Sequence, residues 1–420
     1  MSGADMTASV AGADWFASKR LHRVLDLLNA DGGEARIVGG AVRNTLMGLP
    51  VGDVDIATTL LPQDVVARAE AAGIKAVPTG IDHGTVTLVA DGLPFEVTTL
   101  RVDTEPDGRR AKVAFGADWS LDAQRRDLTI NGLFADASGQ VIDLVGGLDD
   151  IDTKTIRFIG DASTRIEEDY LRILRFFRFF ANYGQGRPDA DGLKACARLK
   201  SGLGQLSAER VWSEIKALLS ATDPSRALLW MRQTSVLTTI LPETEKWGID
   251  AIPGLIEAES ALDWTPDPLL RLMAIVPKDE PRLAAMAKRL RMSKAAAARL
   301  VRFASQPVLG EDLADVALRR HLYRGDPRAI VDTLRLQLSG RRDAAKADDA
   351  ALHGAAKLSR LLGVAENWQR PKFPLSGAVM MGAGVVEGPA VGETLAALEE
   401  AWIDSNFTLT REQLLESIGG

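Results

Sequence analysis

Strand signals in this chain are confined to its first third, between Ala35 and Gly147. There, short β-rich runs alternate with helical ones, and Asp91-Gly92 separates two runs of alternating apolar residues. Asp-Gly at that place predicts a hairpin, because both central residues of a two-residue turn need positive φ. From about Ile151 on, apolar residues recur at spacings of three and four, which is typical of helices. The sequence therefore predicts an α+β protein: an N-terminal head with a mixed β-sheet, followed by an all-α neck, body and tail.

The chain is too long for a single core. At 420 residues, two to four domains are expected. We predict a helical lead-in, a head, a neck, a body and a tail over residues 1–34, 35–150, 151–240, 241–365 and 366–420. We expect a strand at 53–59 and helices at 166–183, 207–220, 224–237, 269–292, 294–306 and about 392–404, with breaks at 184–188, 242, 253–254 and 266–268.

Composition excludes several classes of protein. With 46% hydrophobic and 25% charged residues, the chain is neither disordered nor a disulfide-stapled scaffold. One cysteine, Cys196, and four dispersed histidines argue against a metal site made of these residue types. No apolar run reaches the ~18–20 residues that span a bilayer. The first twenty residues lack a basic region followed by an apolar one, so we expect a cytoplasmic protein with no membrane segment.

Charge is unevenly distributed along the chain. Between Arg282 and Lys346 there are fifteen Lys/Arg and six Asp/Glu, which leaves −16 for the rest of a chain whose net charge is −7. Such a basic stretch predicts a surface for a polyanion. From charge alone, the alternative of solvated helix faces is favoured.

Two glycines and three carboxylates suggest a phosphate and metal site. Gly39-Gly40 follows a predicted strand and precedes a helix, so backbone amides there can approach a phosphate, and Arg43 can reach the same group. Asp53 and Asp55 fall on one face of a strand, which suits Mg²⁺ held by carboxylates and triphosphate oxygens. Glu96, on the predicted hairpin, can complete the site. The alternatives are surface aspartates and a solvent-facing glutamate.

Two sets of arginines add to this pattern. Arg125 and Arg126 can clamp triphosphate oxygens bidentately, or they can belong to a solvated helix end. On a continuous helix, one stripe would hold a set of charged residues flanked by apolar ones, either as a cleft wall or as salt bridges on a surface. The stripe is Arg165, Glu168, Asp169, Arg172 and Arg175.

These residues lie in motifs that resemble those of class II nucleotidyltransferases, the group of CCA-adding tRNA nucleotidyltransferases and bacterial poly(A) polymerases. The motifs are GGAVRN, GDVDIAT, RRDLTINGLF and RFIGDASTRIEEDYLRILRFFRF, in the family's order, and SAERVWSEIKALL resembles a further neck motif. The resemblance implies a nucleotidyltransferase head and two catalytic Mg²⁺ ions. It also departs from the family at Asn44, where the motif usually has Asp.

The resemblance also implies a role for each site residue. Asp53 and Asp55 would bind the metals, with Glu96 as the third catalytic carboxylate. Arg175 would support a pocket in which Asp169 and Arg172 read the incoming base. The residues implied to hold the triphosphate are Gly39, Gly40, Arg43, Arg125 and Arg126.

Two further segments favour one activity within that group. Thr79–Val86 resembles the signature T-G-x-x-H-G-T of CCA-adding members, and the stretch 103–119 resembles the flexible loop of enzymes that add all three nucleotides. The loop residues are Asp107, Gly108, Arg109 and Arg110. The implied partners are tRNA lacking all or part of its 3′ CCA, CTP and ATP, with no obligate protein partner. The alternatives are a bacterial poly(A) polymerase and a non-catalytic RNA-binding protein on the same fold.

The base choice has a physical basis. C and A both present an amine donor beside a ring-nitrogen acceptor, whereas U and G present a carbonyl beside an N–H donor. A carboxylate and a guanidinium match the first pattern, and Asp169 and Arg172, three apart on a predicted helix, supply that pair. A wrong base would leave buried charged groups unpaired, at a cost of a few kcal/mol.

Overall fold

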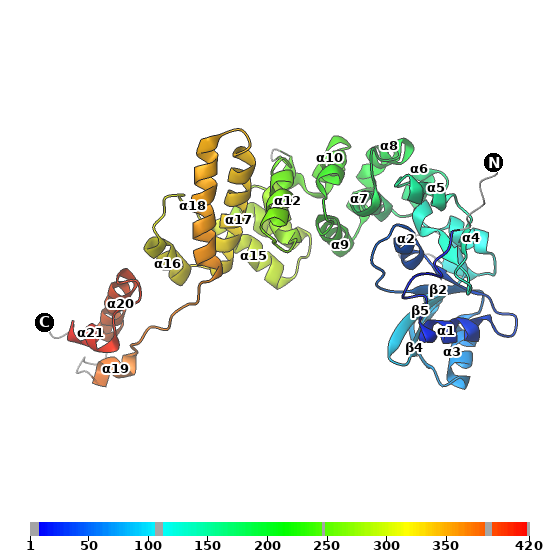
Figure 1. Ribbon diagram of the computed structural model, residues 1–420, viewed down its shortest axis with the longest axis horizontal. Helices are drawn as coiled ribbons and strands as arrows, with labels where there is room; N and C mark the ends of the chain where they lie inside the picture. The colour runs from blue at the N-terminus through cyan, green and yellow to red at the C-terminus, as the bar shows by residue number, and fades with distance from the viewer. Residues whose placement is uncertain (1–7, 106–111, 246–247, 383–388, 418–420) are drawn as a thin grey trace. The chain divides into compact units, whose positions relative to one another are not determined.

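The computed structural model describes residues 8–105, 112–245, 248–382 and 389–417, and confirms the α+β class (Figure 1). The chain forms two compact units, residues 1–242 and 243–420. The first unit contains the sheet and the second is helical. The finer domain boundaries stay predictions.

A seven-stranded mixed sheet forms the base of the first unit. Its strand order is β3-β4-β5-β2-β1-β8-β9, and β2 pairs with β5 in parallel while the other neighbours are antiparallel. Asp91 and Gly92 form the predicted hairpin turn, with φ of 46° and 82°. The strands are β1 Ala35–Val38, β2 Asp55–Thr58, β3 Lys75–Gly80, β4 Thr85–Ala90, β5 Leu93–Thr99, β8 Leu133–Ala135 and β9 Val141–Asp143; a separate pair is β6 Arg101–Glu105 with β7 Lys112–Phe115.

The prediction of a strand over 53–59 was wrong at its start. β2 begins at Asp55, so Asp53 precedes the strand rather than sharing a face of it. Asp55 pairs with Val38 at the end of β1 and with Glu96 on β5. The register therefore places Asp55 and Glu96 side by side at the edge from which α2 (Gly40–Leu46) departs.

Besides α2, short helices precede, connect and follow the strands of the first unit. They are α1 Lys19–Asn29, α3 Pro62–Ala71, α4 Trp119–Gln124, α5 Gly147–Asp152, α6 Ala162–Glu168, α7 Leu171–Tyr183, α8 Ala190–Leu199, α9 Ala208–Leu219, α10 Ser225–Gln233 and α11 Val236–Ile240. The helix predicted over 224–237 is interrupted at Ser235, whose φ is 59°.

The continuous helix predicted over 166–183 was also wrong. α6 ends at Glu168, and Asp169 is extended, with φ −157° and ψ 106°. Oδ1 of Asp169 accepts a hydrogen bond from the backbone N–H of Leu171 at 3.1 Å. The carboxylate thereby satisfies a donor at the start of α7, as N-capping side chains do, which favours a break over a continuous helix.

Helices of the second unit pack around apolar clusters, of which one includes Leu318, Leu334 and Leu358, and another Met380 and Trp402. The helices are α12 Ala251–Ala261, α13 Pro268–Ile275, α14 Glu280–Arg289, α15 Lys294–Ser305, α16 Asp315–Arg324, α17 Pro327–Ala344, α18 Asp349–Glu366, α19 Gly377–Gly382, α20 Pro389–Asp404 and α21 Arg411–Glu416.

Two predictions about prolines in this unit were wrong. The helix expected over 269–292 is two helices, because Pro277 forces the preceding Val276 into extended backbone. The break expected at Pro253-Gly254 is absent, since both lie inside α12. Pro253 occupies the first turn, where a backbone N–H has no intrahelical acceptor to lose.

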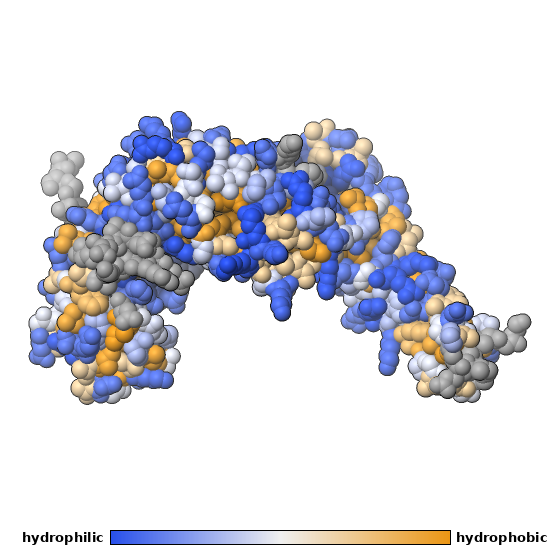
Figure 2. All heavy atoms as spheres, turned by 180° about the vertical axis from the view of Figure 1, so that it is seen from behind, coloured by the Kyte–Doolittle hydropathy of each residue, from blue (hydrophilic) through white to orange (hydrophobic). Residues whose placement is uncertain are grey.

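The face shown in Figure 2 is largely hydrophilic, with smaller apolar patches between the charged side chains. Across the described residues, no helix has both the length and the apolar character needed to cross a bilayer.

Candidate active site

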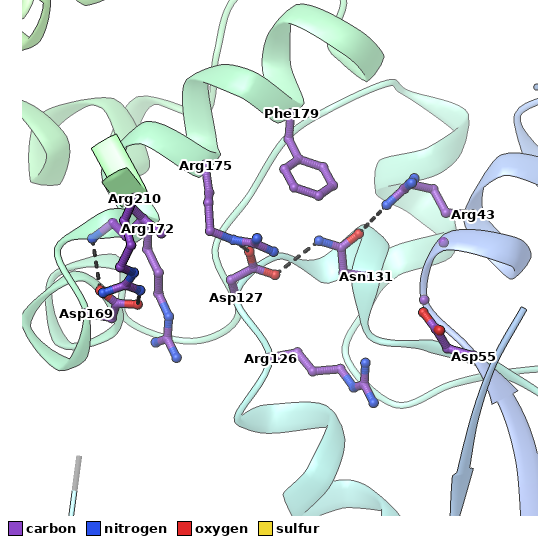
Figure 3. A pocket seen from close by; sticks show the side chains of 13 residues that line it. Arg43, Asp55, Arg126, Asp127, Asn131, Asp169, Arg172, Arg175, Phe179 and Arg210 are labelled. Carbon is purple, nitrogen blue, oxygen red and sulfur yellow. Dashed lines mark hydrogen bonds and ion pairs between the residues drawn. The ribbon is translucent and has the colours of Figure 1, made fainter. Parts of the chain in front are cut away.

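A cavity of about 450 Å³ in the first unit gathers most of the predicted site residues (Figure 3). Eight of them line it: Gly39, Gly40, Arg43, Asp55, Arg126, Asp169, Arg172 and Arg175. Asp53, Glu96 and Arg125 do not line it. The prediction missed the other lining residues, which are Asp127, Asn131, Leu171, Phe179 and Arg210.

The turn from β1 into α2 requires a glycine at position 39. Gly39 has φ 68° and ψ −115°, a backbone conformation that residues with a Cβ rarely adopt, and its N–H donates to the carbonyl of Leu133 at 3.1 Å. This turn lets the chain leave β1 and start a helix at the cavity wall.

The carboxylates lie close enough to influence one another. Desolvation raises the pKa of Asp55, followed by the negative charges of Glu96 and Asp53, while Arg126 opposes the shift. Mutual repulsion of this kind is relieved by a cation, and carboxylate oxygens are the ligands of hard divalent ions. The donor set thus fits such an ion, although within the described ranges no group of three or more His, Cys, Asp or Glu forms a metal cage by itself.

Arg43 is a buried cation with neutral partners. Its side chain is 7% exposed, and burial lowers its pKa. Nε and Nη2 donate to Oδ1 of Asn44 at 3.0 and 2.8 Å, Nη1 donates to Oδ1 of Asn131 at 2.5 Å, and Nη2 also donates to the hydroxyl of Tyr183 at 2.9 Å. Asn44 takes the place of the family's usual Asp without adding a negative charge.

One buried carboxylate holds the two adjacent arginines. Oδ1 of Asp122 accepts from Nε of Arg125 at 2.7 Å, and Oδ2 accepts from Nη2 of Arg126 at 2.9 Å. Asp122 is 1% exposed. Arg126 lines the cavity and extends toward Asp55 (Figure 3), whereas Arg125 is not among the lining residues. The sequence offered a signal for Asp122, an acid three and four residues before the arginines on one helix end.

Asp127 joins the head to α7. Its Oδ2 accepts from Nε of Arg175 at 2.6 Å and its Oδ1 from Nδ2 of Asn131 at 3.0 Å. Asn131 in turn accepts from Arg43, so the dashed bonds in Figure 3 cross the cavity from Arg175 to Arg43. Both Asp127 and Asn131 fall within the RRDLTIN motif, but only tertiary structure reveals their partners.

The two residues predicted to read the base, Asp169 and Arg172, both bond to other residues of the protein. Oδ2 of Asp169 accepts from Nη2 of Arg210 on α9 at 2.6 Å. Arg172 donates through Nη1 to Glu168 and to the carbonyl of Arg165, and Glu168 also pairs with Arg165. The predicted stripe thus contains real salt bridges, but Asp169 and Arg172 both line the cavity.

The residues of the predicted flexible loop, Asp107, Gly108, Arg109 and Arg110, lie outside the described residues.

The basic stretch, Arg282–Lys346, is largely neutralised: at least nine of its fifteen cations pair with carboxylates. These are Arg289, Arg299, Arg302, Arg320, Arg324, Arg328, Arg335, Arg341 and Lys346.

Comparison with known proteins shows the family of this chain. The family profile described as "Poly A polymerase head domain" matches residues 35–157, and one described as "Probable RNA and SrmB- binding site of polymerase A" matches residues 188–247. The zebrafish protein "CCA tRNA nucleotidyltransferase 1, mitochondrial" is 33% identical over 400 residues, which cover 92% of this chain and 87% of that protein. The chain belongs to the class II CCA-adding family.

Other members agree with this assignment. The human protein of the same name is 31% identical over 411 residues, covering 95% of this chain and 89% of that protein. A crystal structure of the Bacillus stearothermophilus CCA-adding enzyme in complex with CTP has a TM-score of 0.68 at 27% identity, covering 94% of this chain and 95% of that one. Nucleotidyltransferases of the CCA-adding family use a divalent metal.

Proposed function

We propose that this protein adds C, C and A to the 3′ end of tRNA from CTP and ATP, without a nucleic-acid template and with release of pyrophosphate. One observation carries the proposal. A single cavity contains Asp55 at a sheet edge, Gly39 and Gly40 at a helix start, and Asp169 with Arg172 on the opposite wall. The family membership of the whole chain supports the same activity.

Base selection by Asp169 and Arg172 is compatible with their present partners. A carboxylate has about four acceptor positions, and Asp169 uses two, for Leu171 and Arg210. A guanidinium has five N–H donors, and the bonds of Arg172 leave Nε–H unused. Asp169 can therefore accept from the exocyclic amine of C or A while Arg172 donates to the ring nitrogen. Arg175, held by Asp127, supports this wall.

The other end of the cavity suits the triphosphate. Gly39 and Gly40 present backbone at the start of α2, and the charges of Arg43 and Arg126 line the same space, with Arg125 beside them. We assign these five residues to the triphosphate. The 3′-hydroxyl of tRNA then attacks the α-phosphate in line, and pyrophosphate leaves.

We assign Asp53 and Asp55 as the metal ligands, with Glu96 as a third catalytic carboxylate, and Mg²⁺ as the ion, two per reaction. Bound there, the ions would lower the pKa of the attacking hydroxyl and stabilise charge on pyrophosphate. The raised pKa of Asp55 beside Glu96 and Asp53 supports this assignment, because the cluster gains from a cation.

Two alternatives receive less support. A bacterial poly(A) polymerase shares the head, but the full-length relatives described above are named for CCA addition. A non-catalytic RNA-binding protein has no need of clustered carboxylates. For the compartment, we propose the cytoplasm on the basis of the sequence composition, although the zebrafish and human relatives are named mitochondrial.

A nucleotide-addition assay tests the function. A tRNA that ends before its CCA is incubated with Mg²⁺ and CTP alone, ATP alone, UTP alone, or CTP with ATP. We expect two residues added with CTP, none with ATP or UTP alone, and three with both. Asp55→Asn serves as the inactive control. Long A tracts from ATP would instead identify a poly(A) polymerase, and no addition in any mixture would contradict an enzymatic role.

A further inference from the structure

Arg43 makes no direct ion pair at the cavity wall, and the charge of Asp127 acts on it from beyond Asn131. Its hydrogen-bond acceptors are Asn44, Asn131 and Tyr183, all neutral, and no carboxylate within the described ranges pairs with it. A buried cation is costly unless a partner offsets it. A cation that meets only neutral groups at a cavity wall therefore attracts an anionic ligand.

Tyr183 holds this guanidinium in two ways. Its hydroxyl accepts from Nη2 of Arg43 at 2.9 Å, and its ring centroid lies 4.1 Å from the guanidinium carbon. The second contact is a cation–π interaction, which adds attraction without adding negative charge. The ring of Phe179, also on α7, lies 5.2 Å from the same carbon.

The bonds to Arg43 form a closed ring with α7. Tyr183 and Arg175 lie on that helix, about 12 Å apart along its axis at 1.5 Å per residue. From Arg175 the bonds run to Asp127, Asn131 and Arg43, and then return to Tyr183. The ring fixes the cation of α2 relative to the helix that carries the base-reading wall.

The hydrogen bonds also aim the guanidinium. Arg43 has five N–H donors, and four are directed at Asn44, Asn131 and Tyr183. The remaining Nη1–H is available to a ligand. Loss of the tyrosine hydroxyl would release one Nη2–H and leave the group freer to rotate.

We infer that Tyr183 is a positioning residue for the triphosphate: it acts through Arg43, a cation without an ion pair that it holds at the phosphate end of the cavity. The inference rests on the proposed function in assigning that end to the triphosphate. It extends the set of site residues beyond those that the sequence motifs predicted, since Tyr183 lies outside these motifs.

The affinity for pyrophosphate, measured by calorimetry in Mg²⁺ buffer without tRNA, tests this inference. Tyr183→Phe keeps the ring and removes only the hydroxyl, so the fold should be retained. We expect its pyrophosphate Kd to rise about three- to tenfold, as for a hydrogen bond to a charged group. The Kd of cytidine, which lacks phosphate, should stay unchanged. Tyr183→Leu also removes the cation–π contact and should have a larger effect on pyrophosphate.

The matched control is Tyr323→Phe, which removes a hydroxyl that donates to Glu399 at 2.6 Å in the second unit. It should change neither affinity. An unchanged pyrophosphate Kd in Tyr183→Phe would overturn the inference, as would equal weakening of pyrophosphate and cytidine, or a wild-type protein that binds no pyrophosphate. These measurements need no turnover, so the tRNA addition assay separately decides whether the proposed function fails.

Discussion

Nε of Arg175 donates to Oδ2 of Asp127 across 2.6 Å, and this ion pair joins α7 to the loop that follows Arg126. Burial by itself would raise the pKa of Asp127, but the charge and hydrogen bond of Arg175, with bonds from Asn131 and Leu128, lower it below the ordinary value of 3.8. A carboxylate whose pKa is lower in the folded than in the unfolded state stabilises the fold above the unfolded value. That stabilisation is lost as the pH falls through the folded value.

Asp127→Asn should therefore destabilise the protein in a pH-dependent manner. At pH 7 we expect a loss of about 3 kcal/mol, because Arg175 is left without its carboxylate. The difference in Tm between wild type and variant should shrink as the pH falls below about 4. Thermal unfolding from pH 7 to pH 3 measures it. A difference that stays constant over this range would show that the charge of Asp127 does not stabilise the fold.

Asp53→Ala and Asp55→Ala should abolish addition without unfolding the protein. Desolvation and the charges of Glu96 and Asp53 raise the pKa of Asp55, so its ionised form costs free energy at pH 7 and its removal should not lower the Tm. We expect less than about a hundredth of wild-type turnover and unchanged tRNA affinity. Higher residual turnover in either variant would refute the metal-ligand assignment.

Deletion of residues 105–112 should stop addition at CC. The resemblance implies the family's flexible loop there, and in the proposed mechanism the same Asp169 and Arg172 fit a pyrimidine twice and then a purine. We propose that this polar segment lets the site change its fit from C to A. Product length on a sequencing gel measures it, and equal loss of C and A addition would make the segment a general folding element.

Salt dependence of tRNA binding should come from the cations of the second unit that have no carboxylate partner in the described part of the chain. They include Arg282, Lys288, Lys294 and Arg342. Converting each to Gln should flatten the slope of log affinity against log salt by about one unit per lost phosphate contact. Arg335→Gln, which breaks the pair with Glu366, is the matched control and should leave the slope unchanged. Equal slopes for all variants would show that these cations are only solvated.

Local signals account for much of the fold and site. The Asp91-Gly92 turn has one favoured geometry, and Gly39 after β1 has a positive φ that favours glycine, so both features could be predicted. The break at Asp169 could not, because apolar spacing continues across it and the capping bond depends on the three-dimensional path. Arg210 was missed because it is 41 residues from Asp169. The folded structure brings Arg210 to Asp169, and no periodic pattern in the sequence indicates this contact.

The neutralised basic stretch illustrates the same limit. A local excess of arginines predicts a positive surface only if the acids that face it are few. Arg320 and Arg324 pair with Glu400 on α20, which is far away in sequence. Charge counted along the chain therefore overstated the free cations of this unit.

The most direct test of the account is whether Asp169 chooses the base. Asp169→Asn keeps an oxygen for the N–H of Leu171 and presents an amide donor to the incoming nucleotide, which matches the carbonyl of U rather than the amine of C. The ratio of kcat/KM for CTP over UTP should fall by a factor of about thirty, the effect of one charged hydrogen bond. Arg210→Ala removes the ion pair of Asp169 without changing its carboxylate, so the ratio should persist even if turnover falls. An unchanged ratio in Asp169→Asn, with only lowered activity, would contradict the account and leave Asp169 as a helix-capping residue.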